Sequence, residues 1–162
     1  MALFNRTLFK AANIDNTIKI VLDAITSSIE AGFSIAGALT TTAGGIGYAT
    51  GAGGAATQLT SRATGVTINA LSGTITTNAT SLALGASAEF TVTNSQVAIG
   101  DVVVLSQQSG SSIAAGVAGT AIVGVVNVAA GSFIVTVNNN STTTAETGAI
   151  IINFAVIKAV SA

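Results

Sequence analysis

An alternation of apolar and polar side chains restricts the second half of the chain to β structure. It appears in residues 66–70, 89–93 and 133–137, where apolar side chains alternate with positions rich in Thr, Asn or Glu. Successive side chains of a strand point to opposite faces of its sheet, so this pattern predicts half-buried strands. Two further runs, residues 102–105 and 150–157, are apolar at almost every position. They are expected to be central strands or strands covered by another subunit.

Turn residues separate these runs at short intervals. The turns are expected at residues 94–95, 100–101, 109–111, 138–140 and 147–148, which are rich in Gly, Asn, Ser and Thr. About six to eight short strands at this spacing are typical of all-β domains. We therefore expect a mainly β protein, with a sandwich or jelly-roll-like β domain over residues 65–162.

Residues 1–32 form a separate, charged segment. They hold six of the eleven charged side chains of the chain, and short polar residues at positions 13–16 can cap a helix. Apolar side chains then recur at helical spacing, which predicts a short amphipathic helix. Its stripe either packs on its own domain or joins copies of the chain. The stripe consists of Ile18, Leu22, Ile25 and Ile29.

Residues 33–64 are rich in Gly, Ala and Thr and contain one charged side chain, Arg62. Glycine at this density makes a regular helix or strand costly in backbone entropy, so we expect an extended arm or linker. Tyr48, the single tyrosine, is either an anchor in a partner's pocket or an ordinary, partly buried side chain. Tyr48 and Arg62 join the helical stripe as candidate interface residues.

The chain carries few charges, which narrows the class of partner. Charged side chains make up 7% of the residues, and none lies between 102 and 145. A net charge of −1 gives no field that attracts phosphate, so we expect no nucleic-acid partner. Residues 113–133 are apolar but interrupted by glycine and polar side chains, and we expect no membrane span. The charged N-terminal residues do not match a secretory signal.

The residue types that catalysis and metal binding use most are missing. The chain has no His and no Cys, so we expect no catalytic site, no cofactor and no metal. The acidic side chains after residue 65 are Glu89, Asp101 and Glu146. Asp101 follows Gly100 at an expected turn and Glu146 lies in a Thr-rich loop, so turn formation and solvation account for these two. Lys158 is the only base there that a serine nucleophile would have. A small β-fold hydrolase is the enzymatic alternative, and we expect no enzyme.

Four segments carry a resemblance to a known group of proteins. They are GAGGAATQLTSRATGVTINALSGTITTN, EFTVTNSQVAIGDVVVLS, VAAGSFIVTVNN and IINFAVIKA. The most specific parts are residues 53–69 and 153–159. Together these segments resemble a recurrent β module of tailed-bacteriophage virion proteins, a group with head decoration and tail-fibre-like members. The similar region runs from Tyr48 to Ala159, about two-thirds of the chain.

The resemblance implies a non-enzymatic structural module and brings no catalytic residues. It leads to the hypothesis of a capsid decoration (cement) protein, a homotrimer that bridges major capsid subunits. Such a protein is made in the host cytoplasm and ends on the capsid surface of the virion. The alternative is a short head or tail fibre or appendage subunit that binds the host surface. The short chain, with 4% aromatic residues and no Trp, favours the cement hypothesis. A cellular surface-layer or pilus-like subunit is disfavoured, because the N-terminus does not match a secretory signal.

Overall fold

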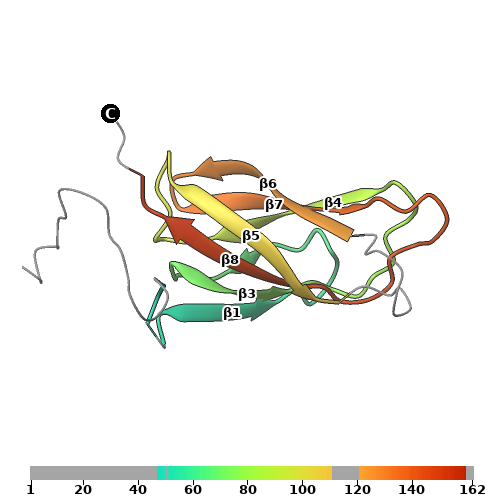
Figure 1. Cartoon of the computed structure of the whole chain (residues 1–162), viewed down its shortest axis with the longest axis horizontal. Coiled ribbons are helices and arrows are strands. Elements are labelled where there is room, and N and C mark those ends of the chain that lie inside the picture. The colour runs from blue at the N-terminus through green and yellow to red at the C-terminus, as the bar shows by residue number, and fades with distance from the viewer. Residues whose placement is uncertain (1–46, 50, 111–120, 160–162) are drawn as a thin grey trace, which may run out of the picture. The chain divides into compact units, whose positions relative to one another are not determined.

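The computed structural model describes residues 47–49, 51–110 and 121–159, and the regular secondary structure in these residues is β (Figure 1). The expected helix with its stripe Ile18, Leu22, Ile25 and Ile29 lies outside the described residues. Within them, the strands are β1 (Gly53–Thr57), β2 (Val66–Thr67), β3 (Ser72–Thr76), β4 (Ser87–Thr93), β5 (Val102–Ser109), β6 (Ala121–Ala129), β7 (Ser132–Asn139) and β8 (Ile151–Ile157).

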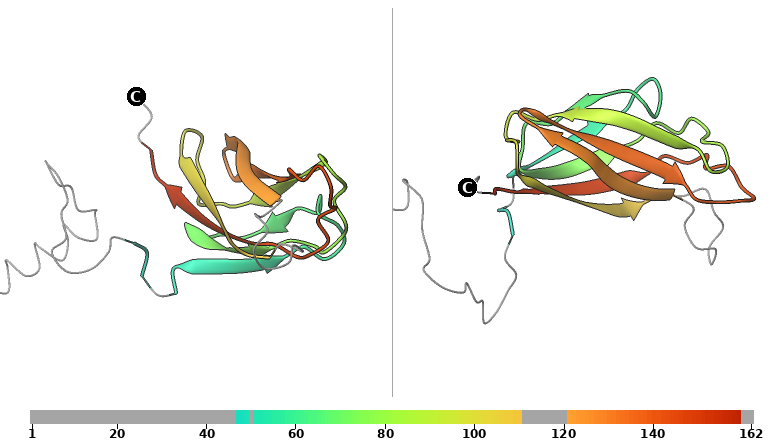
Figure 2. Two further views of the ribbon diagram at one scale, coloured as in Figure 1. Left: turned by 45° about the vertical axis from the view of Figure 1, so that its right-hand side comes forward. Right: turned by 90° about the horizontal axis from the view of Figure 1, so that it is seen from above.

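The strands form two four-stranded sheets. Sheet A has the order β1-β3-β8-β5, and sheet B has the order β2-β4-β7-β6. The β1–β3 and β2–β4 pairs are parallel and the other pairs antiparallel. The strands of both sheets lie roughly along one common axis, some running one way and some the other (Figures 1 and 2). The mainly β prediction is confirmed, whereas the parallel pairs depart from the antiparallel sheets of a jelly roll.

One hydrophobic core receives side chains from both sheets. The rings of Phe133 in β7 and Phe154 in β8 lie 5.5 Å apart between centroids. Every second side chain of β7 is buried, and β8 follows the same alternation. β8 lies between β3 and β5, so the prediction of a central strand is confirmed for this run.

The other run that is apolar on both faces lies at the edge of a sheet instead of its centre. Residues 102–105 begin β5, which is an edge strand of sheet A and pairs only with β8 among the described strands. Val103 and Leu105 pack against the core, but Val102 and Val104 are 51% and 49% exposed. The expectation of a central strand is wrong here, because β5 pairs with a neighbour on one side only. Its two outward valines are exposed because the described residues leave the outer face of sheet A open. Cover by another subunit stays a prediction.

Part of the glycine-rich arm belongs to sheet A. β1 pairs with β3 along its whole length, from Gly53 opposite Ser72 to Thr57 opposite Thr76. A Cβ atom on Gly73 would lie 2.3 Å from the carbonyl oxygen of Gly54, so glycine permits this close pairing. The compact unit begins at Gly47. It therefore includes residues 47–64, which composition alone assigned to an arm.

Candidate interaction surfaces

The outer side of sheet A forms a surface without charge. Its side chains alternate with those that face the core, as the burial of each strand shows. The register places on this side Gly53, Ala55 and Thr57 of β1, Ser72, Thr74 and Thr76 of β3, Ile151, Asn153, Ala155 and Ile157 of β8, and Val102, Val104 and Ser106 of β5. We call this surface the neutral face. Its small, uncharged side chains can be covered by protein without desolvating an ion.

The β5 end of the neutral face is apolar. Val102 lies opposite Ile157, and Val104 lies opposite Ala155 in the antiparallel register. Directly opposite side chains on one face of such a pair are about 4.5–5.5 Å apart at Cβ. Val102, Val104 and Ile157 are each about half exposed, and we call these three side chains the apolar patch. Contiguous exposed apolar groups are a mark of interaction sites.

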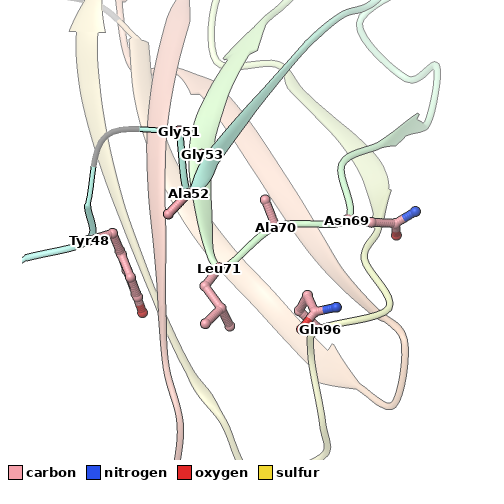
Figure 3. A pocket seen from close by; sticks show the side chains of 8 residues that line it. All are labelled: Tyr48, Gly51, Ala52, Gly53, Asn69, Ala70, Leu71 and Gln96. Atoms are coloured by element: carbon pink, nitrogen blue, oxygen red, sulfur yellow. The ribbon is translucent and has the colours of Figure 1, made fainter. Parts of the chain in front are cut away.

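Tyr48 lies beside the end of β8. It is 45% exposed, and its hydroxyl donates a hydrogen bond to the carbonyl oxygen of Val156. Together with Asn69, Leu71 and Gln96 it lines an open hollow of about 330 Å³ (Figure 3). No lining residue is charged. The structure thus fixes the hydroxyl of Tyr48 and leaves part of its ring in contact with solvent.

Arg62 lies inside the domain. It is 3% exposed, and its Nη2 donates to the carbonyl oxygen of Gly148 at 2.6 Å. Its Nε donates to the carbonyl oxygen of Thr80, and its Nη1 to the hydroxyl of Thr77 at 3.4 Å. The side chain therefore ties the segment after β1 to the segments after β3 and before β8. Arg62, expected as an interface residue, presents almost no surface to a partner.

Glu146 accompanies Arg62 in this buried cluster. Burial lowers the pKa of Arg62, and the negative charge of Glu146 opposes that shift. Glu146 is 0% exposed and accepts a hydrogen bond from the backbone N–H of Gly148 at 3.1 Å. The expectation that Glu146 is solvated is therefore wrong. One feature of the sequence is consistent with this interaction between Arg62 and Glu146. The two are isolated, opposite charges in otherwise neutral segments.

Asp101 and Lys158 form an ion pair. Nζ of Lys158 donates to the carboxylate of Asp101 and to the carbonyl oxygen of Gln96, the latter at 2.9 Å. The hydrogen bond from Lys158, and then that from the backbone N–H of Ala98, lower the pKa of Asp101. The turn role expected of Asp101 is confirmed by the Ala98 bond, although its side chain is 1% exposed. In this pair Lys158 acts as a hydrogen-bond donor, whereas a serine nucleophile needs a proton acceptor.

The described residues hold no group of side chains of the kind that binds a metal ion. In residues 47–49, 51–110 and 121–159, no three His, Cys, Asp or Glu side chains lie together as metal ligands would. Glu89 is exposed on β4, as expected. The same part of the chain contains no helix of the length and apolarity that crossing a membrane requires.

Comparison of the chain with models of protein families, with curated proteins and with solved structures finds no match.

Proposed function

We propose that this chain is a non-enzymatic structural protein of a bacteriophage virion, a capsid decoration (cement) protein that bridges and stabilises major capsid subunits. The observation that carries the proposal is the neutral face, an exposed sheet surface without a charged side chain. Interface cores are depleted of charged residues in the same way. The resemblance of residues 48–159 to phage virion modules supplies the biological setting.

The use of the charged side chains supports a structural role. In the described part of the chain, Arg62 ties three segments together and Asp101 pairs with Lys158. These groups hold the loops of a β-sandwich, and Glu89 is the one acidic side chain there that is exposed. In the proposed protein, the β domain presents the neutral face, and the helix expected from the sequence of residues 1–32 adds a second attachment.

A decoration protein that binds at many equivalent places on a capsid shell needs only a modest affinity at each contact. A standard interface buries about 800 Å² on each partner. A protein that bridges two capsid subunits converts its second contact into an intramolecular one, which raises the overall avidity by about 10²–10⁴. Many weak bridges therefore reinforce a shell without any single tight site.

The proposal is tested with phage heads assembled without this chain. Adding the purified chain is expected to raise the temperature at which the heads lose integrity, measured by release of their DNA. An unrelated protein of similar size, added at the same concentration, is the control and should leave that temperature unchanged. An unchanged release temperature after addition of the chain itself contradicts the cementing role.

One observation favours the alternative of a host-binding appendage. Tyr48 is 45% exposed at one side of the hollow, and Asn69 and Gln96 line its other side (Figure 3). A ring so placed can act as a platform for a sugar. The alternative predicts that the chain binds host cells and that Tyr48→Ala abolishes this binding. Binding to cells without binding to heads would replace the cement proposal.

A further inference from the structure

We infer that copies of this chain contact one another through the apolar patch, Val102, Val104 and Ile157. The inference rests on the proposed assembling role and names the surface by which the chain would self-associate. It is tested in solution without capsids, so its failure is distinct from failure of the proposed function.

Exposed apolar side chains are concentrated on three strands. Among the described residues, five of the nine large apolar side chains that are exposed belong to β5, β6 and β8. They include Ile122 and Val126 on β6, the edge strand of sheet B, which contacts β5. Single exposed apolar residues are ordinary. Apolar side chains that strand pairing places side by side can be buried together by another protein surface. Their removal from water lowers the free energy of the complex.

In the described part of the chain, the edge of β5 lacks two of the usual protections, charged side chains and proline. Natural edge strands are blunted by charged side chains, by proline or by a cover. β5 is eight residues long, VVVLSQQS, with neither a charge nor a proline. No described strand pairs with its outer edge. One bulge occurs, near its end between Gln107 and Ser109, so residues 102–107 keep a regular register with β8.

A second copy of the chain is a partner that the uncharged face can accept. Two copies related by symmetry bring identical surfaces together, so a charged surface would meet like charge. The neutral face avoids this repulsion. The two charged side chains next to the apolar patch in the sequence, Asp101 and Lys158, are paired with each other within the chain.

Single-cysteine variants of the full chain test this contact, because the natural sequence has no Cys. Val104→Cys is expected to form disulfide-linked pairs on mild oxidation, since Val104 of one copy lies near that of another. Leu84→Cys is the matched control: Leu84 is 50% exposed against 49% for Val104, but it lies outside the patch. It should give no linked pairs at the same protein concentration.

A charge placed on the patch gives an independent measurement. Val104→Asp is expected to weaken self-association about tenfold or more, since a carboxylate would be desolvated in the contact. Light scattering should then show a mass near 15.7 kDa at concentrations where the natural chain is larger. Leu84→Asp should keep the larger mass. Thermal melting of each variant shows whether the fold is retained.

Three results would overturn the inference. The natural chain could be monomeric up to high concentration. Val104→Asp could fold and keep the larger mass, which would place the contact elsewhere. Val104→Cys could resist a thiol reagent in a monomeric chain, which would show that residues of the same chain cover the patch. A chain that self-associates through the patch but leaves phage heads unchanged would refute the cement proposal alone.

Discussion

Replacing Arg62 with alanine removes the group that ties three loop segments of the domain. The variant loses hydrogen bonds to the carbonyl oxygens of Thr80 and Gly148 and to the hydroxyl of Thr77. It also loses the positive charge that interacts with Glu146. The other basic side chain in the described residues, Lys158, is bound to a different carboxylate.

The magnitude follows from burial. Arg62 is 3% exposed and Glu146 is 0% exposed, so water screens their interaction little. Removing one of two interacting buried charges costs about 3–5 kcal/mol, because the remaining charge stays desolvated. Typical domains are stable by about 5–15 kcal/mol. Arg62→Ala is therefore expected to remove a large part of the free energy of unfolding.

Urea unfolding at neutral pH, followed by circular dichroism, measures this loss. With a slope of about 2 kcal/mol per molar urea, the midpoint should fall by about 2 M. Arg62→Lys should lose less, since it keeps the charge near Glu146 but lacks the planar fork that reaches several acceptors. A midpoint for Arg62→Ala within about 0.2 M of the natural chain, or about 0.5 kcal/mol, would refute the reasoning.

Two further predictions concern stability. The pKa of Asp101 is lowered in the folded chain, so its stabilising effect is present above the ordinary Asp pKa of about 3.9 and is lost as pH falls toward the folded value. Lys158→Met should flatten this part of the pH profile, measured by thermal melts from neutral to acid pH; an unchanged acid slope contradicts the assignment. Gly73→Ala should destabilise the domain by about 1–3 kcal/mol, as its Cβ would lie 2.3 Å from the carbonyl oxygen of Gly54. Gly124→Ala is its control, because the nearest atom to that Cβ is at an ordinary 3.6 Å; equal melting temperatures for the two variants would contradict the packing argument.

The strands could be predicted where their own side chains alternate. β4 and β7 follow this rule, because burial on one face leaves a period of two in the sequence. β1 could not be found this way. Its sequence GGAAT has poor strand preference, and its place depends on pairing with β3, which is a tertiary contact.

The candidate surfaces were predictable in part for a similar reason. The valines of residues 102–105 predict burial on both faces, but the sequence does not distinguish a central strand from an edge strand that awaits a partner. Arg62 was expected at the surface because charged side chains are seldom buried unless paired. Its partner Glu146 is distant in the chain, so only the fold brings the two together. Tyr48 is a partly buried side chain with a bound hydroxyl, and its role as an anchor in a partner's pocket stays a prediction.

Electron microscopy of phage heads assembled with and without this chain tests the cement proposal most directly. We predict additional density on the outer surface of the shell, repeated at the junctions between major capsid subunits. The chain should sediment with these heads. Density confined to the tail, or particles identical in the two preparations with the chain left in solution, would contradict the proposal.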